Sequence, residues 1–296
     1  NLIPTYFDGT AIQLGSFPVR WYGVMYIFAF VTAYLTMWKI NKKENMGYTK
    51  DQFDSLFTWI IAGILIGARL GYVFFYKASY YLSNPSEIIL PLTHDALGYH
   101  FSGIAGMSYH GGLILGIAFT IIGIKKNKMD LWKTLNLCFL AAPLAYTWGR
   151  WGNFINGELF GEVTTSPIGM WFPLAHDSPM TNPILHHPSQ LYESFFEGIF
   201  LWTVLWSLRK KKPFDGFYSA IYTGGYGIVR FIIEYFREPD ADLGFRRSPT
   251  GDTVIYQNNS LLNISTGQIL CFLMILGSIA FIVIGLIQKK KKESKK

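Results

Sequence analysis

Charged residues are scarce in this chain. Asp, Glu, Lys and Arg together make up 15% of its 296 residues, whereas half of the chain is hydrophobic and 17% is aromatic. A soluble domain carries about 25% charged residues, so the composition excludes a globule with a single membrane anchor. It predicts an all-α fold, a polytopic membrane helix bundle of about seven transmembrane helices.

Cysteine is also rare. Cys138 and Cys271 both lie inside apolar runs, which excludes a disulfide framework and a CxxC redox site. Four residues with metal-binding side chains lie in a stretch rich in proline and polar residues, without the spacing of a metal site: His176, Asp177, His186 and His187. The sequence therefore predicts no metal and no cofactor.

Seven segments are long and apolar enough to cross a bilayer, whose ~30 Å hydrocarbon core needs about 20 residues of helix. They are Trp21–Lys39, Ser55–Tyr76, Met107–Ile124, Leu131–Trp148, Gln190–Leu208, Gly216–Phe236 and Thr266–Ile287. The fourth segment is short, and polar residues interrupt the sixth.

Lysine marks one side of these segments. Most of the 26 Lys and Arg residues fall in four clusters on alternate connections, near residues 39–50, 125–133 and 209–212 and in the C-terminal tail. The positive-inside rule makes these connections cytoplasmic, with the N-terminus outside and the C-terminus inside. We therefore expect a single transmembrane bundle over residues 1–288 and a basic cytoplasmic tail at 289–296. External loops near 78–106, 162–188 and 239–265 would form a small extracytoplasmic head region.

Outside these clusters, basic residues are nearly all arginine. They are Arg20, Arg69, Lys77, Arg150, Arg230, Arg237, Arg246 and Arg247. A topological signal needs only positive charge, whereas the planar arginine fork grips phosphate or carboxylate through two parallel hydrogen bonds. This distribution predicts anion binding on the outer side.

Unusual polar residues within the predicted spans all fall in the outer half. They are Arg69, His110, Glu193 and Glu197, with Tyr22 at the mouth of the first span. In the sixth span Tyr226, Arg230, Glu234 and Arg237 cover only about 80° of the helix circumference and form one stripe. Ionisable residues inside a membrane are functional candidates.

The densest polar segment runs from Gly149 to Gly161, at the end of the fourth span. It holds an arginine, two asparagines, a glutamate and four glycines. Such groups cannot face lipid, so we expect them to line a protected cavity in which glycine lets the backbone approach a ligand. Arg150 has no carboxylate three or four residues away along its own helix. If Arg230 and Glu234 neutralise each other, Arg237 also lacks a partner. We therefore expect the charge of Arg150 to be free for an external anion.

Two features have a structural as well as a functional interpretation. His110, followed by Gly111-Gly112, suits either an interhelical hydrogen bond or a proton acceptor, because imidazole titrates near neutrality. The Gly63/Gly67/Gly71 and Gly112/Gly116 spacings favour close helix packing alone.

The Gly149–Gly161 segment, GRWGNFINGELFG, resembles the signature of the bacterial prolipoprotein diacylglyceryl transferase family. Four motifs accompany it in the family's order: Arg20-Trp21-Tyr22-Gly23, Tyr109-His110-Gly111-Gly112, HPSQLYE at residues 187–193 and YGIVRFIIEYFREP at residues 226–239. The resemblance covers nearly the whole chain. Lys77–Gly106 and Ala241–Ser265 match no motif of the family.

The resemblance implies a transferase of the bacterial inner membrane. Its substrates would be phosphatidylglycerol, a membrane lipid, and the lipobox cysteine that follows the signal peptide of a preprolipoprotein, with no nucleic acid involved. The diacylglyceryl group would pass to the cysteine thiol as a thioether, and glycerol phosphate would leave.

The resemblance also implies roles for individual residues. His110 would take the thiol proton, and Arg150 and Arg230, together with Arg237, would stabilise the departing phosphate. Asn153 and Glu158 would orient the head group or the arginines. Four further residues would belong to the substrate-binding set. Tyr22 and Tyr226 would form hydrogen bonds at the water interface, Glu234 would hold its neighbours in place, and Gly161 completes the set.

Other classes of protein also need arginines in a membrane cavity. A transporter or flippase for an anionic lipid or another phosphate-bearing substrate typically has its site at the bilayer midplane between repeats, and the chain has no strong internal repeat. A lipid-acting acyltransferase or phosphatase would place its nucleophile or base in a different motif. A non-catalytic seven-span receptor would not need three buried arginines beside a histidine.

Overall fold

The computed structural model describes residues 9–15, 17–89, 92–95, 98–101, 106–172, 184–237, 245–247 and 264–294. The predicted external loops near 78–106, 162–188 and 239–265 therefore lie partly outside the described residues. The chain divides into two compact units, one formed by Asn1–Ile40 with Leu135–Lys296 and the other by Asn41–Thr134.

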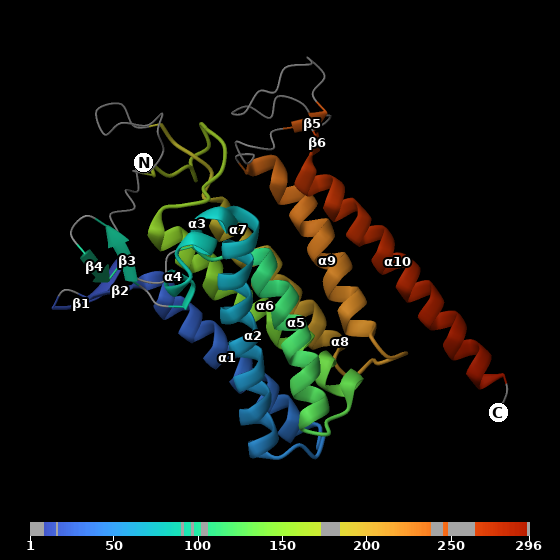
Figure 1. Ribbon diagram of the computed structural model, residues 1–296. Coiled ribbons are helices and arrows are strands. Elements are labelled where there is room, and N and C mark those ends of the chain that lie inside the picture. The colour runs from blue at the N-terminus through green and yellow to red at the C-terminus, as the bar shows by residue number, and fades with distance from the viewer. Residues whose placement is uncertain are drawn as a thin grey trace. The chain divides into compact units, whose positions relative to one another are not determined.

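The first unit is mainly helical (Figure 1). Its helices are α1 (Trp21–Lys43), α6 (Leu131–Asn156), α7 (Ser189–Glu193), η1 (Ser194–Phe200), α8 (Leu201–Leu208), α9 (Phe217–Ile233), η2 (Glu234–Phe236) and α10 (Thr266–Glu293). The last residues of α1 and the first of α6 belong to the other unit. Two antiparallel strand pairs complete the first unit: β1 (Thr10–Leu14) with β2 (Phe17–Arg20), and β5 (Phe245–Arg247) with β6 (Ile264–Ser265).

The second unit is built on a pair of long helices that run side by side (Figure 1). Its elements are α2 (Lys50–Tyr76), α3 (Ala78–Ser83), α4 (Ser86–Ile89), α5 (Tyr109–Lys126) and an antiparallel pair of strands, β3 (Leu92–Asp95) and β4 (Gly98–Phe101). A capping box begins α2, in which Thr49 and Gln52 satisfy each other's backbone N–H groups. The Ser108 side chain caps α5 by accepting from the Gly111 N–H group.

Glycine brings α2 and α5 into close contact. A Cβ atom added at Gly71 would lie 2.6 Å from the Gly111 Cα atom, and one added at Gly63 would lie 2.5 Å from the Phe119 Cβ atom. At Gly116 an added Cβ atom would lie 3.0 Å from Ile64. The prediction that these small residues serve helix packing is confirmed, because the two backbones could not approach so closely with side chains between them.

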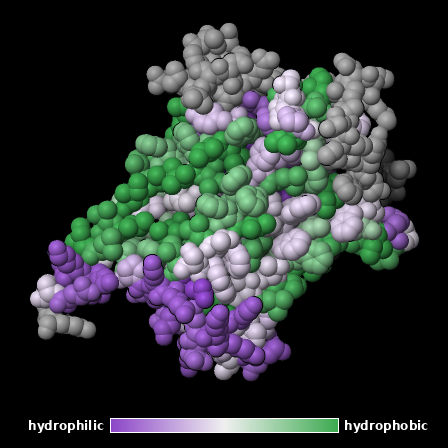
Figure 2. Space-filling view, turned by 180° about the vertical axis from the view of Figure 1, so that it is seen from behind, coloured by the Kyte–Doolittle hydropathy of each residue, from purple (hydrophilic) through white to green (hydrophobic). Residues whose placement is uncertain are grey.

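Each of the seven predicted membrane segments lies in helix apart from a residue or two at its ends. Among the helices that the structure describes, α1, α2 and α10 have the length and apolar composition to cross a membrane. Large apolar side chains are exposed along them, for example Leu35 on α1, Phe74 on α2 and Leu273 on α10. Figure 2 shows hydrophobic residues over much of one face of the molecule. The protein is thus a mostly helical, multi-pass membrane protein.

The fourth predicted segment differs from the structure at its end. We expected it to stop at Trp148, but α6 continues through the glycine-containing sequence to Asn156. Gly152 keeps a helical conformation and makes room for Tyr22 of α1, whose Cδ2 atom would lie 2.9 Å from an added Cβ atom. The helix ends where Gly157 takes a φ of 67°, a left-handed conformation that glycine adopts without strain.

Irregular helical structure surrounds the contact between α6 and η1. Pro143 lies inside α6, and η1 is a π-helical turn between α7 and α8. Thr147 donates to the Pro143 carbonyl group at 3.2 Å and lies against Gly198 of η1. Because π-helical turns often occur at functional sites, this contact indicates a candidate functional site in the first unit.

Candidate active site

Three arginines and three glutamates meet in the first unit. Arg150 comes from α6, Glu193 and Glu197 from α7 and η1, and Arg230, Glu234 and Arg237 from α9, η2 and the residue after η2. We call these six residues the arginine–carboxylate cluster. The side chains of Glu193 and Glu197 are fully buried, and a buried carboxyl group needs ionic or hydrogen-bonding partners.

Glu193 is the centre of this cluster. Its Oε2 atom lies 2.6 Å from Arg150 Nε, and its Oε1 atom lies 3.0 Å from an Nη atom of Arg230 and 3.2 Å from Arg237 Nε. Its position at the end of α7 lets it face α6 and the α9–η2 segment together. One carboxylate therefore holds all three arginines in a fixed arrangement.

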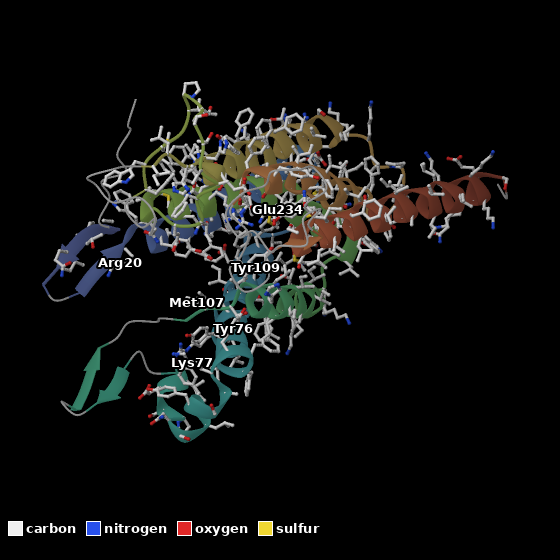
Figure 3. All side chains as sticks on the ribbon, turned by 90° about the horizontal axis from the view of Figure 1, so that it is seen from above. Arg20, Tyr76, Lys77, Met107, Tyr109 and Glu234 are labelled. Atoms are coloured by element: carbon white, nitrogen blue, oxygen red, sulfur yellow. The ribbon has the colours of Figure 1, made fainter. Side chains whose placement is uncertain are left out.

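Glu234 ties the outer end of the cluster to the start of α10. Its Oε2 atom lies 3.3 Å from both Arg230 and Arg237, and its Oε1 atom accepts a hydrogen bond from Ser265 at 2.9 Å. Figure 3 labels Glu234. Ser265 also caps α10 with Gln268, so Glu234 is held by a helix start. The place of Glu234 in the substrate-binding set stays a prediction.

The expectation that Arg150 and Arg237 have no carboxylate partner is wrong. Both arginines pair with Glu193. Glu193 lies more than forty residues away from each of them along the sequence and on a different helical segment. Local spacing within a helix could not reveal such a partner. These arginine side chains are mostly buried: 17% of the Arg150, 13% of the Arg230 and 11% of the Arg237 side chain remain exposed.

Tyr146 is a member of the site that sequence reasoning missed. Its hydroxyl group accepts a hydrogen bond from Arg150 Nε at 2.7 Å, and it contacts Glu193 at 3.2 Å and Glu197 more closely. The Arg150 guanidinium also lies 4.9 Å from the centre of the Tyr146 ring. The signal in the sequence was its position four residues before Arg150, on the same side of α6.

Asn153 and Glu158 extend the cluster along the end of α6. Asn153 accepts from an Nη atom of Arg150 at 3.2 Å and donates to Glu158 Oε1 at 2.9 Å. The Glu158 backbone carbonyl group accepts from Gln190 at the start of α7 at 2.7 Å. The structure therefore brings the predicted residues Arg150, Asn153 and Glu158 into one hydrogen-bonded chain.

Gly161 lies at a junction of backbones. Its N–H group donates to the His187 carbonyl group at 2.8 Å, and Gly161 forms an antiparallel bridge with Arg237. An added Cβ atom would lie 2.9 Å from the His187 carbonyl oxygen and closer still to that of Phe236. A side chain here would therefore displace the segment that carries Arg237.

The predicted residues Tyr22 and Tyr226 lie in the same unit as the cluster. The Tyr226 ring packs edge-on against Tyr146, with 5.9 Å between ring centres. The Tyr22 hydroxyl group lies 3.3 Å from that of Tyr26 on the same helix. Tyr226 thus borders the cluster through Tyr146.

Histidine occurs beside the cluster as well. His187 precedes α7, and its Nδ1 atom lies 3.0 Å from the Tyr192 hydroxyl group. Burial lowers the pKa of His187 below its usual value, and the neighbouring His186 lowers it further. At neutral pH this imidazole is accordingly uncharged. Within the described parts of the chain, no three His, Cys, Asp or Glu side chains are grouped so that they would hold a metal ion.

His110 and Arg69 belong to the second unit. His110 is exposed in the first turn of α5, and its ring lies edge-on to that of Tyr109, which Figure 3 labels. Arg69 donates to the backbone carbonyl groups of Glu87 and Ile88 at 2.6 and 2.9 Å. Arg69 thus fastens α4 to α2.

The arrangement suits a ligand whose anionic group is attached directly to the bond that reacts. Arginine carries five N–H donors, and one carboxylate oxygen uses only one or two of them. Because the cluster fixes three guanidinium groups in advance, it can stabilise charge that develops on a phosphate without reorganising.

Comparison with known proteins identifies the relatives of this chain. The prolipoprotein diacylglyceryl transferase family matches residues 9–284. A phosphatidylglycerol–prolipoprotein diacylglyceryl transferase from Chlorobaculum tepidum is 45% identical over 282 residues, which cover 95% of this chain and 91% of the relative. Proteins of the same name from Treponema denticola and Campylobacter lari are 45% and 39% identical, over 94% and 91% of this chain and 92% and 90% of their own lengths. The chain therefore belongs to the prolipoprotein diacylglyceryl transferase family.

Proposed function

We propose that this protein transfers the diacylglyceryl group of phosphatidylglycerol to the lipobox cysteine thiol of a preprolipoprotein. Relatives that share up to 45% identity over most of the chain carry this activity in their names. The observation that carries the proposal is the convergence of Arg150, Arg230 and Arg237 on one buried carboxylate. Guanidinium groups suit a lipid phosphate because they can donate two parallel hydrogen bonds to its oxygens.

The arginines would bind the phosphate of the lipid and stabilise its departure. Glu193 pairs with each of the three guanidinium groups, and 11–17% of each arginine side chain stays exposed. Charge grows on the phosphate oxygen as the bond to glycerol carbon breaks. Donors that are fixed in place before the reaction stabilise this charge most effectively.

The nucleophile arrives with the peptide substrate. The thiol loses its proton, the thiolate sulfur attacks the glycerol carbon, and a C–S bond forms as the C–O bond breaks. The electron pair of the C–O bond leaves with glycerol phosphate. We propose that His110, an exposed imidazole at the start of α5, accepts the proton of the thiol.

The remaining site residues would position the head group. Asn153 and Glu158 fix one side of Arg150 through the hydrogen bonds described above. Tyr22 and Tyr226 would offer hydroxyl groups to the glycerol of the head group. Gly161 would contribute by allowing the close backbone approach that places Arg237.

The site would face the outer side of a bacterial inner membrane. We infer seven transmembrane helices with the N-terminus outside and a lysine-rich C-terminus inside, following the distribution of basic residues. The loops between helices on the outer side would form a small head region. The signal peptide of the preprolipoprotein would approach from this side, where its lipobox cysteine emerges from the membrane.

Incubation of the purified protein with phosphatidylglycerol and a lipobox peptide tests the proposal. Mass spectrometry should detect the peptide with one diacylglyceryl group attached. A peptide with serine in place of cysteine should remain unmodified. If the cysteine peptide also stays unmodified while fluorescent phosphatidylglycerol crosses a bilayer that contains the protein, the protein moves lipid instead of transferring it.

A further inference from the structure

Glu197 differs from the other two glutamates of the arginine–carboxylate cluster in the partner that it holds. Glu193 and Glu234 each lie within 3.3 Å of two or more arginines. Glu197 lies 3.8 Å from Arg230, a longer contact than any of theirs. It lies closer to the Tyr146 hydroxyl group, which donates to its Oε2 atom. Because the Glu197 side chain is fully buried, it is out of reach of a ligand and acts only through its neighbours.

The direction of the Tyr146 hydroxyl proton decides which groups this hydroxyl can serve. Its oxygen accepts from Arg150 Nε at 2.7 Å, and the Oε2 atoms of two carboxyl groups lie within reach, that of Glu193 at 3.2 Å and that of Glu197 closer. A hydroxyl group has a single proton to donate, and the nearer acceptor is Glu197. The lone pairs of Tyr146 therefore stay directed at Arg150, and Glu193 Oε2 stays available to Arg150 Nε at 2.6 Å.

These contacts fix one edge of the Arg150 guanidinium group. Its Nε atom is held by Tyr146 and Glu193, and an Nη atom donates to Asn153 at 3.2 Å. Arginine has five N–H donors in a rigid plane, so holding the Nε edge also sets the direction of the Nη edge. Two parallel hydrogen bonds to a phosphate require this direction to be correct.

The π-helical turn η1 presents Glu197 to Tyr146. Glu193 ends α7, and Glu197 lies four residues later within η1. The next residue, Gly198, lies so close to α6 that an added Cβ atom would overlap the hydroxyl oxygen of Thr147. Thr147 directly follows Tyr146 on α6, so this close approach brings the Glu197 carboxyl group to the Tyr146 hydroxyl group.

We propose that Glu197 is a positioning residue, which acts through the Tyr146 hydroxyl group to orient the Arg150 guanidinium group toward the lipid phosphate. The inference rests on the proposed function and adds to the phosphate site a residue that does not touch the substrate. Arg230 offers a weaker path, because it keeps Glu193 at 3.0 Å and Glu234 at 3.3 Å when Glu197 is changed.

A double-mutant cycle isolates the path through Tyr146. Glu197→Leu removes both acceptor oxygens, and Glu197→Gln keeps one, in an amide group that binds the hydroxyl group more weakly than a carboxyl group. Each is made in the parent and in Tyr146→Phe. Glu87→Leu is the matched control, because Glu87 is a buried glutamate of the second unit that accepts from the Tyr80 hydroxyl group at 2.8 Å. Transfer rates give kcat and the KM of the peptide, and thermal unfolding of each purified variant shows whether it has folded.

We expect Glu197→Leu to lower kcat by about tenfold or more, the effect of losing one hydrogen bond in a charged network. Glu197→Gln should lose less, and the KM of the peptide should stay near that of the parent. In Tyr146→Phe, where the hydroxyl group is absent, either change should alter kcat by less than about twofold. Glu87→Leu should lower the unfolding temperature and leave kcat unchanged.

Three results would overturn the role of Glu197: equal losses of kcat with and without the Tyr146 hydroxyl group, an unchanged kcat in the parent background, or a loss confined to the KM of the peptide. If Glu197→Leu does not fold, the comparison of Glu197→Gln in the two backgrounds decides by the same criteria. A parent protein that transfers no diacylglyceryl group would contradict the proposed function itself.

Discussion

Arg150 bears most directly on the assignment of the phosphate site. Replacing it with lysine keeps the charge and the possibility of an ion pair with Glu193, but removes the planar fork that binds two phosphate oxygens together. We expect both Arg150→Lys and Arg150→Ala to lower kcat by about 10²–10³-fold, the typical effect of losing one fixed donor to a developing anion. Arg150→Lys should fold like the parent, whereas Arg150→Ala leaves the buried Glu193 with one partner fewer and should also lower the unfolding temperature. Steady-state transfer rates and thermal unfolding measure the two properties.

Arg69→Lys is the comparison for this experiment. Arg69 binds backbone carbonyl groups of α4 rather than the cluster, so its replacement should lower the unfolding temperature and affect transfer only mildly. Full activity in a folded Arg150→Ala protein would remove Arg150 from the phosphate site and leave the role to Arg230 and Arg237.

Tyr146 should act as a positioning residue for Arg150. The variant Tyr146→Phe retains the ring and removes the hydroxyl group that contacts Arg150, Glu193 and Glu197. Hydrogen bonds to charged groups contribute about 1.5–3 kcal/mol, so we expect kcat/KM to fall by about ten- to a hundredfold. The fall should lie in kcat more than in the KM of the peptide.

Tyr218→Phe is the matched control for Tyr146→Phe. The Tyr218 hydroxyl group donates to backbone carbonyl groups of Leu208 and Arg209 at the other end of α9. Its loss should affect unfolding and leave kcat unchanged. If the two variants show the same kinetics at comparable stability, the Tyr146 hydroxyl group does not position Arg150.

His110 should reveal its role through the pH dependence of transfer. If it accepts the thiol proton, His110→Asn should bind lipid normally and lose about 10²–10⁴-fold in turnover. Because a cysteine thiol with a pKa of about 8.5 ionises unaided at higher pH, the loss should be partly relieved as pH rises from 7 to 9. A variant with a near-normal rate at pH 7 would leave His110 only a structural role.

For individual residues, the sequence predicted which polar side chains of the first unit lie close together better than how they are paired. The polar stripe on the sixth segment and the Gly149–Gly161 motif both lead into the cluster. Their partner Glu193 was visible only as a polar residue in the outer half of the fifth segment. An ion pair between helices depends on how the helices pack, and local spacing does not contain that information. Tyr146 lies four residues before Arg150, so local spacing did hold a signal for this contact.

Among the elements, the α2–α5 pair depends on glycine. A Cβ atom at Gly111 would lie 2.7 Å from the Gly71 Cα atom, so Gly111→Ala must separate two backbones. Overpacking of this kind typically costs about 1–3 kcal/mol, and we expect a lower unfolding temperature in detergent. Gly277→Ala on the exposed side of α10 should change stability by less than about 0.5 kcal/mol. Equal unfolding temperatures for Gly111→Ala and the parent would contradict the close packing.

Helix positions followed from hydrophobic segments with only small errors at the ends. The continuation of α6 to Asn156 was not predicted, because glycine and several polar residues in succession disfavour helix. In the structure, contacts made by Tyr22 and Arg150 keep this part of α6 helical. The π-helical turn η1 was also not foreseen. It depends on contact with Thr147 near Pro143 of α6, which becomes visible only once the helices are packed.

For the whole molecule, the orientation in the membrane is the prediction most open to test. Cysteine placed at Ser83, the last residue of α3, should react with an impermeant maleimide from the outer side, and cysteine at Asn127, after α5, only once the membrane is opened. The starting protein should carry Cys138→Ala and Cys271→Ala so that only the new thiol reacts. Labelling of Asn127→Cys from outside in intact cells would reverse the orientation and move the proposed site to the cytoplasmic side.

Family membership and the arginine–carboxylate cluster together favour transfer over transport. The relatives are named as transferases, and the cluster joins charges from three segments of one unit without an inverted repeat in the sequence. A transporter for an anionic lipid would bind the same phosphate, yet it would leave every covalent bond of the lipid in place. The products therefore distinguish the two functions.

The most direct test of the account is the stoichiometry of the products. Purified protein is incubated with phosphatidylglycerol and a lipobox peptide, and the thioether peptide and free glycerol phosphate are quantified over time. The account predicts equal molar amounts of both products, and neither product when the peptide is omitted. Release of glycerol phosphate without thioether formation, or a parent protein that forms neither product, would contradict it.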